Sequence, residues 1–271
     1  MNTALTIAGS DPCGGAGIQA DLKTFSAHGV YGTSVITAVT VQNTLKVYSV
    51  QEINPNIVYD QIIYLFDDIH IDAVKIGMVS SIELIETIAA ALKKVKALAI
   101  VLDPVMISKS GYSLLNTDAA NALVKNLFPL AEVVTPNIFE AQALTKSKIS
   151  TVEDMKNAAA KILNSGAKKV VVKGGHLEKE QATDILFDGN TYTELTSRRI
   201  ETKNTHGTGC TFSSAIASNI AKGMGFKEAV SDAKIYITKA IQHSINIGHG
   251  HGPVGHFFNF TSNFPAKAST R

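Results

Sequence analysis

A glycine-rich turn stands directly before an apolar helix near the carboxyl end of the chain. In the segment NTHGTGCTFSSAIASNIAKG, apolar residues at helical spacing follow Gly207, Thr208, Gly209 and Cys210. The first turn of a helix carries unpaired N–H groups and partial positive charge, and glycines let the backbone approach a ligand closely. These residue types at this spacing therefore predict an anion-binding turn.

The thiol in this turn has more than one interpretation. A lone cysteine below a helix is most often a small apolar core residue. Helix N-termini also favour the thiolate, so the sequence predicts a pKa of Cys210 below about 8.5 and a side chain that faces a bound anion. A cysteine nucleophile for acyl transfer would need a histidine and a carboxylate beside it, and His206 is close in sequence but on the other side of the turn.

Two carboxylates and a lysine follow apolar runs that have the character of buried strands. Asp103 stands in VLDPVM, Glu140 in TPNIFEA and Lys173 in VVKGGH. Carboxylates at strand ends suit Mg²⁺, and a lysine before glycines suits a phosphate. Local roles are the alternative, because Asp103 could form a turn or cap, and Asn137 with Glu140 could form a capping box. If the strands are neighbours, both carboxylates lie near one metal ion.

The first glycine-rich loop, GSDPCGGAGIQADLK, matches the relaxed dinucleotide fingerprint G-x-G-x-x-A at residues 15–20. Residues 35–47 contain no acid to hold a ribose, so an NAD site is not expected, and the absence of any Gly-Lys dipeptide excludes a Walker P-loop. Asp21 falls in the predicted first turn of the next helix, where it could simply stabilise the dipole. Gln42 ends the second strand, and its amide suits a heteroaromatic edge unless it is an ordinary loop residue.

These loops connect the elements of a predicted α/β sheet. Continuous apolar runs such as ALAIVLD predict strands covered on both faces, hence a mostly parallel sheet with helices on both sides. We expect strands at 4–8, 34–41, 73–76, 98–102, 132–135 and 169–172, and helices at 16–28, 55–67, 81–95, 117–127, 138–144, 151–165, 209–222 and 226–245. Alternation around Asp188-Gly189 in residues 183–203 predicts an antiparallel edge hairpin. No linker is visible, so we expect a single domain over residues 1–271, with 261–271 as a loose polar tail.

Composition excludes several classes of protein. The net charge is +2 and 18% of residues are charged, which argues against nucleic-acid or membrane partners. Only Cys13 and Cys210 are cysteines, so no disulfide framework is implied. The N-terminus lacks the features of a signal peptide, and no apolar run approaches the ~18 residues that span a bilayer. We therefore expect a cytoplasmic protein.

Eight segments in unbroken order, from residue 3 to about 260, carry a family resemblance. They are LTIAGSDPCGGAGIQADLKTF, TAVTVQNT, KIGM, LDPVM, TPNIFEA, VVVKGGH, HGTGCTFSSAIAS and GHGHGPVGHF. Together they resemble bacterial hydroxymethylpyrimidine and phosphomethylpyrimidine kinases of thiamine biosynthesis, in the ribokinase-like superfamily. The resemblance implies a three-layer ribokinase-like fold, Mg²⁺ as cofactor, a homodimer, and ATP-dependent phosphorylation of 4-amino-5-hydroxymethyl-2-methylpyrimidine and of its monophosphate to the diphosphate.

The resemblance also implies a role for each site residue. It places the pyrimidine against Gly9, Ala16 and Asp21, with Gln42 reading the amino and ring-nitrogen edge and with Met78 and Val105 on the ring faces. It places ATP and Mg²⁺ over Asp103, Asn137, Glu140 and Lys173, with the phosphates on residues 207–210. Cys210 then occupies the catalytic-base position, where most of the superfamily carries an aspartate.

Two rival functions share this scaffold. A pyridoxal kinase would have the same fold, metal site and anion-binding turn, and Gln42 is the residue that favours the pyrimidine. A catalytically silent sensor of vitamin precursors would not need to retain Asp103, Glu140, Lys173 and the complete turn. Both remain alternatives to the main prediction.

The histidines near the C-terminus are a further candidate for a site. His249 and His251, with His243 and His256, have the composition of metal ligands. The resemblance explains GHGHGP as a family element, so no zinc site is expected. Cys13 is expected only to pack in its turn.

Overall fold

The computed structural model describes residues 1–106, 115, 117–175, 177 and 180–260. In these residues one nine-stranded sheet has the order β3-β2-β1-β4-β5-β6-β7-β8-β9. The strands are β1 Thr3–Ser10, β2 Tyr31–Gln42, β3 Val47–Glu52, β4 Ala73–Ile76, β5 Ile100–Leu102, β6 Val133–Val134, β7 Val170–Val172, β8 Gln181–Phe187 and β9 Tyr192–Arg198. Strands β2, β1, β4, β5, β6 and β7 are parallel, whereas β3, β8 and β9 pair antiparallel at the two edges.

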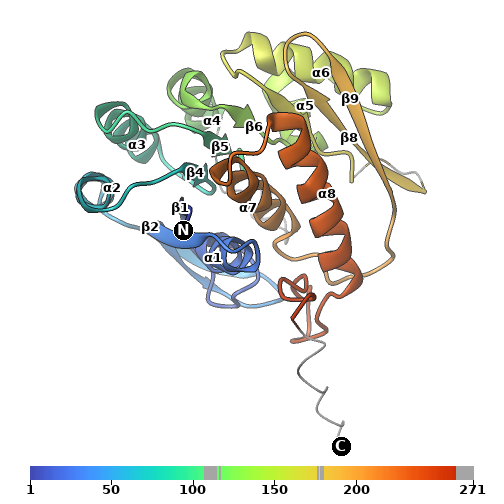
Figure 1. The fold of residues 1–271 in the computed structure, drawn as a ribbon, viewed down its shortest axis with the longest axis horizontal. Helices are drawn as coiled ribbons and strands as arrows, with labels where there is room; N and C mark the ends of the chain where they lie inside the picture. Colours follow the sequence, from blue (N-terminus) through green and yellow to red (C-terminus); the bar gives the residue numbers. More distant parts are fainter. Residues whose placement is uncertain (107–114, 116, 176, 178–179, 261–271) are drawn as a thin grey trace, which may run out of the picture.

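Helices cover both faces of this sheet (Figure 1). Helices α1, α7 and α8 pack on one face, and α2 to α6 pack on the other. Their bounds are α1 Gly17–Ala27, α2 Pro55–Asp68, α3 Ile82–Lys94, α4 Thr117–Asn126, α5 Ile138–Thr145, α6 Val152–Asn164, α7 Thr208–Ala221 and α8 Phe226–Gln242, with a 3₁₀ turn at Phe128–Leu130. The predicted three-layer α/β architecture is confirmed.

The strands alternate between two hydrophobic cores. In β5, Ile100 and Leu102 belong to the core under α2 to α6, and Val101 belongs to the core under α7. Successive side chains of a strand point to opposite faces, so a strand covered on both faces must be apolar at every position. This is the physical origin of the continuous apolar runs in the sequence.

The structure corrects the predicted secondary structure in two places: it adds strand β3 and it moves the start of β5. Strand β3 was not predicted, because five of its six residues are at least partly exposed and its mixed composition does not differ from that of a loop. Leu98 is 77% exposed and Ala99 has a φ of 51°, so β5 begins at Ile100 rather than at residue 98. The predicted edge hairpin is confirmed as β8 and β9, and the predicted tail at 261–271 lies outside the described residues.

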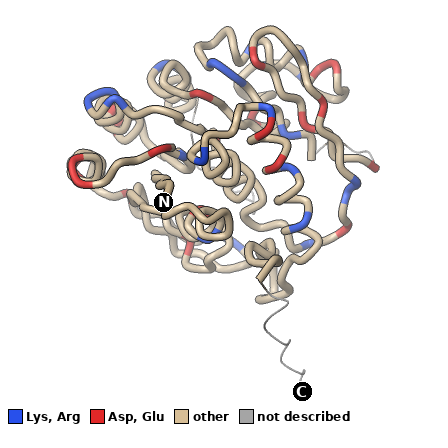
Figure 2. The backbone as a smooth tube through the Cα atoms, viewed as in Figure 1, with Lys and Arg blue, Asp and Glu red and all other residues tan. Residues whose placement is uncertain are grey.

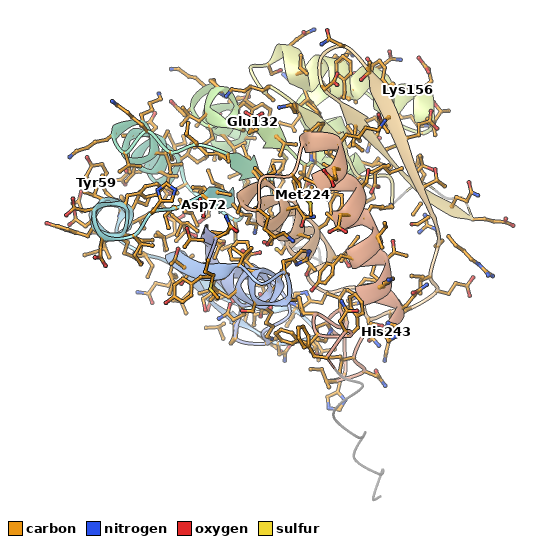
Figure 3. The ribbon with its side chains drawn as sticks, in the orientation of Figure 1. Tyr59, Asp72, Glu132, Lys156, Met224 and His243 are labelled. Carbon is orange, nitrogen blue, oxygen red and sulfur yellow. The ribbon has the colours of Figure 1, made fainter. Side chains whose placement is uncertain are left out.

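Acidic and basic residues are interspersed along the chain (Figure 2). Asp72 and Glu132 stand directly before β4 and β6, at the N-terminal edge of the parallel strands (Figure 3). Asp72 accepts a hydrogen bond from the backbone N–H of Thr3 at 2.7 Å, and Glu132 pairs with Lys168 at 3.3 Å and with Lys169. This edge is therefore occupied by local ion pairs and hydrogen bonds. In the part of the chain that the structure describes, none of the helices has the length and apolar content needed to cross a membrane.

Candidate active site

A cavity of about 710 Å³ lies at the opposite edge, where the parallel strands end. The loops after β1, β4, β5, β6 and β7, the end of β2 and the start of α7 all contribute to its lining. The predicted site residues that line it are Gly9, Ala16, Gln42, Met78, Asp103, Val105, Asn137, Glu140, Lys173, Gly207, Thr208, Gly209 and Cys210. Of the predicted site residues, only Asp21 does not line the cavity.

The predicted anion-binding turn begins helix α7. Gly207 is the N-cap residue and has a φ of 76°, a left-handed conformation that favours glycine. A side chain there would also collide with the carbonyl oxygen of Gly15, so the two glycine-rich loops touch at this point. A Cβ on Gly209 would lie 3.4 Å from both Asp103 Oδ2 and Lys173 Nζ. The first turn of α7 therefore lies directly against an acid–lysine pair at the cavity.

Asp103 is held at the end of β5 and is only 2% exposed. Its Oδ1 accepts hydrogen bonds from Lys173 Nζ at 2.7 Å and from Thr135 Oγ1 at 3.2 Å. Burial lowers the pKa of Lys173, but attraction to Asp103 and Glu140 outweighs burial and raises it above its ordinary value. Lys173 therefore stays positively charged next to the anion-binding turn.

Asn137 and Glu140 form the capping box considered for them and also lie at the cavity. Asn137 Oδ1 accepts from the Glu140 N–H at 3.0 Å, and Glu140 Oε2 accepts from the Asn137 N–H at 2.7 Å, which confirms the capping box of α5. Both residues also line the cavity. Burial raises the pKa of Glu140 to about 7, and repulsion by Asp103 adds to this effect although Lys173 opposes it. A cation near these carboxylates would favour the ionised form of Glu140.

The prediction for the ionisation of Cys210 is wrong. Burial, together with the charges of Asp21 and Asp103, raises the pKa of this thiol to about 11 against the attraction of Lys75. The helix start would lower the pKa of Cys210, but its effect is smaller than the combined effect of desolvation and of the two nearby carboxylates, which disfavour the thiolate. The side chain is nevertheless half-buried and lines the cavity, so it is not sealed in the core.

Asp21 differs from both interpretations offered for it. Helix α1 begins at Gly17, so Asp21 lies beyond its first turn, and its exposed fraction is 0%. It accepts hydrogen bonds from Lys75 Nζ at 2.8 and 3.0 Å, and from Ser214 Oγ at 2.7 Å. Direct contact between Asp21 and a ligand in the cavity is therefore a wrong prediction. Ser214 is one turn after Cys210, so the buried Asp21–Lys75 pair supports the start of α7 from behind.

Sequence reasoning missed Lys75 and Asp11. Lys75 is the one charged residue in the fully buried strand AVKI, and that contrast was the available signal. Asp11 follows β1 as Asp103 follows β5, and it is 3% exposed. Its carboxylate accepts from the N–H groups of Cys13 at 2.9 Å and Ala16 at 2.8 Å and lies 2.8 Å from His206 Nε2, so it organises the first loop.

A further ion pair that lines the cavity was also missed. Lys234 Nζ on α8 donates to Asp184 Oδ2 on β8 at 2.8 Å, and both residues line the cavity. Asp184 Oδ1 accepts from the N–H of Gly174 at 2.8 Å. This bond holds the glycine loop that directly follows Lys173.

The C-terminal histidine segment packs behind the anion-binding turn. The N–H of Gly252 donates to Asn204 Oδ1 at 3.1 Å, and the N–H of His251 donates to Thr44 O at 2.9 Å. His256 Nε2 lies 3.0 Å from Thr211 Oγ1, in the first turn of α7. In the described residues no group of three or more His, Cys, Asp or Glu side chains is placed to hold a metal ion.

A mostly parallel α/β sheet with a helix start that faces a lysine and two carboxylates defines the class of ribokinase-like small-molecule kinases. The family model described as phosphomethylpyrimidine kinase matches residues 11–255. The hydroxymethylpyrimidine/phosphomethylpyrimidine kinase of Rhizobium meliloti (strain 1021) is 53% identical over 257 residues, which cover 94% of this chain and 96% of that protein. The chain belongs to the phosphomethylpyrimidine kinase family.

Solved structures agree with this assignment. The phosphomethylpyrimidine kinase of Clostridium difficile 630 has a TM-score of 0.79 and 52% identity, covering 89% of this chain and 100% of that chain. The pyridoxal kinase of Staphylococcus aureus, in complex with AMP-PCP and pyridoxal, has a TM-score of 0.89 and 36% identity, covering 96% of this chain and 95% of that chain. The chain is therefore similar both to a phosphomethylpyrimidine kinase and to a pyridoxal kinase.

Proposed function

We propose that this protein transfers the terminal phosphate of ATP to 4-amino-5-hydroxymethyl-2-methylpyrimidine and then phosphorylates the monophosphate to the diphosphate. The observation that carries the proposal is that the start of α7, which lies beside Lys173 and Asp103, lines the same cavity as Gln42 and Met78. The family match and the name of the Rhizobium meliloti relative support the substrate.

The chemistry follows from what these residues can do. Phosphoryl transfer depends on in-line positioning and on neutralising charge more than on covalent help. The amides of the first turn of α7 offer preorganised donors to phosphate oxygens, and Lys173 adds a fixed positive charge. We propose that Lys173, Asn137 and Thr208 contact the nucleotide.

Mg²⁺ is part of this proposal. Mg²⁺ is usually bound by one or two carboxylates together with substrate phosphates. Asp103 and Glu140 fit that pattern, since both carboxylates line the cavity and the raised pKa of Glu140 is what a nearby cation would reverse. When bound there, Mg²⁺ would neutralise the charge of the transferring phosphate.

We propose Cys210 as the group that accepts the proton of the acceptor hydroxyl. It lines the cavity at the anion-binding turn, and Lys75 is the cation that acts on it from behind. A base with a pKa of about 11 is mostly protonated at neutral pH, so the thiolate would become available only when Mg²⁺ adds positive charge beside it. A thiol, unlike a permanent carboxylate, would not repel the phosphate of the monophosphate substrate.

Analysis of reaction products tests the proposal against its rivals. Phosphorus NMR of mixtures with ATP, Mg²⁺ and hydroxymethylpyrimidine should show the monophosphate and then the diphosphate. Pyridoxal phosphate formed in preference would support the pyridoxal kinase, which the similarity to the Staphylococcus aureus enzyme favours. If no ADP forms with either substrate, the result would support a catalytically silent sensor. A Cys210→Ala variant is the control, with turnover reduced about 10²- to 10⁴-fold if Cys210 is the base.

We also propose that the chain is one kinase domain that acts as a homodimer in the cytoplasm. The sheet that runs through residues 3–198 supports a single domain. Exposed apolar side chains beside the edge strand support self-association: Val39, Val41 and Tyr48 are 47%, 59% and 53% exposed. Light scattering should give the mass of a dimer for the wild type and of a monomer for Val41→Lys.

A further inference from the structure

His206 connects two groups on one side of the cavity. Its exposed fraction is 9%, and its Nε2 lies 2.8 Å from Asp11 Oδ2 and 3.3 Å from the amide nitrogen of Gln42. The backbone N–H of His206 donates to Gly252 O at 3.0 Å. Gly15 packs so closely against the ring that a Cβ there would collide with it. The imidazole is therefore held in one position by contacts on several sides.

The hydrogen at Nε2 follows from the chemistry of its partners. An ionised carboxylate can only accept, so Nε2 must carry the hydrogen that it donates to Asp11. Burial raises the pKa of Asp11, but hydrogen bonds from His206 and from backbone N–H groups outweigh burial and lower it overall. A nitrogen that carries a hydrogen cannot also accept one from an amide N–H. The amide atom of Gln42 that faces His206 must then be its oxygen.

A half-turn of the Gln42 amide exchanges its oxygen and nitrogen and satisfies both neighbours. The oxygen then shares the Nε2 hydrogen with Asp11, as the longer branch, at 3.3 Å, of a bifurcated hydrogen bond. The nitrogen takes the position now 3.4 Å from Thr40 Oγ1. The Thr40 hydroxyl donates its hydrogen to Ser10 O at 3.0 Å, so its oxygen can accept the amide N–H.

We propose that His206, held by Asp11, is a positioning residue that fixes the orientation of the Gln42 amide and so selects the substrate. In this orientation the Gln42 amide has one oxygen lone pair and one N–H left to bond a ligand in the cavity. Their relative positions are fixed. An amide pairs in this way with an amino group next to a ring nitrogen, as glutamine pairs with adenine. Pyridoxal has no such pair of groups. The inference rests on the proposed function, because it concerns how the pyrimidine is chosen.

Two substitutions at the same position separate positioning from folding. His206→Leu removes the donor, whereas His206→Gln places an amide N–H near the position of Nε2. We expect His206→Leu to raise KM for hydroxymethylpyrimidine about 10- to 100-fold, the loss of one or two aligned hydrogen bonds, with kcat within about threefold. KM for pyridoxal should change less than about threefold, and His206→Gln should restore most of the loss. His251→Gln, whose imidazole bonds to Lys203 O outside the cavity, is the matched control.

Neutron diffraction of the deuterated wild-type protein tests the geometry without any substrate. The expected result is deuterium on Nε2 of His206 and the amide deuterons of Gln42 directed toward Thr40 and the cavity. Amide deuterons directed at His206 would overturn the inference even if His206→Leu failed to fold. An unchanged KM in folded His206→Leu, or equal damage in His206→Gln, would overturn it while the proposed function stands. A wild type that does not phosphorylate the pyrimidine would end the proposed function, and the deuteron positions would still decide the orientation.

Discussion

The thiol of Cys210 should resist ionisation in the free protein. Burial, with repulsion by Asp21 and Asp103, raises its pKa from 9.0 to about 11 despite the attraction of Lys75. Two pKa units mean about 100-fold less thiolate at any pH well below both values, so about one thiol in a thousand is ionised at pH 8. Alkylation by iodoacetamide proceeds through the thiolate, so its rate reports this fraction.

The assay is a pH titration of a Cys13→Ser variant, in which Cys210 is the remaining cysteine. Thiolate absorbance and alkylation rate should both rise without a plateau up to about pH 10, and alkylation at pH 8 should be about 100-fold slower than for an exposed thiol. Asp103→Asn in the same background should lower the pKa, because it removes a negative charge. A plateau with a pKa below about 8.5 would refute the reasoning, since the helix start would then outweigh burial and both carboxylates.

Other parts of the site give predictions that are equally direct. Lys173→Met should lower kcat/KM for ATP about 10- to 100-fold in steady-state kinetics, because a charge-assisted phosphate contact is lost, and an unchanged value would show that Lys173 contacts no phosphate. Gly207→Ala combines a φ of 76° with a collision, so urea unfolding should show a free energy of unfolding lower by about 2 kcal/mol or more. Gly209→Ala, whose Cβ meets its nearest neighbours at 3.4 Å, should remain close to the wild type in the same experiment. Burial lowers the pKa of His256 from 6.5 to about 4. Between these two pH values the unfolded chain binds a proton that the folded chain does not, so the free energy of unfolding falls as the pH drops from 6.5 to 4. The loss reaches about 3 kcal/mol at pH 4. His256→Gln should flatten that part of the stability–pH curve, and a curve of unchanged slope would contradict the assignment. Cys210→Asp should impair phosphorylation of the monophosphate more than that of the alcohol, and equal rates on the two substrates would show that charge repulsion is not the reason for a thiol.

Several residues that line the cavity could be predicted from the sequence because the fold makes their position predictable. Asp103 and Lys173 each follow an apolar run, and parallel strands end at the same edge of a sheet. Glycine at 207 and the helical spacing after it likewise predicted the start of α7 to within a residue. Strand β3 was not predicted, because an exposed edge strand has little hydrophobic periodicity.

The partners of those residues could not be found in this way. Asp21 and Lys75 are 54 positions apart, and Asp11 and His206 are 195 apart, yet each pair is in hydrogen-bonding contact. Nothing in the local pattern of either residue indicates the other. Asp21 was therefore predicted to contact a ligand, whereas it is fully buried with a lysine.

The sequence by itself determined the α/β class, the order of the loops and the glycine-rich start of α7, because these follow from residue type and spacing along the chain. Together with the family resemblance, it also predicted thirteen of the residues that line the cavity. Only the tertiary structure decided the electrostatics: the raised pKa of Cys210, the buried Asp21–Lys75 pair and the contact of His206 with Asp11 and Gln42. Ionisation depends on desolvation and on charges a few ångströms away. Those distances exist only after β1, β2, β4, β5 and α7 have been brought together.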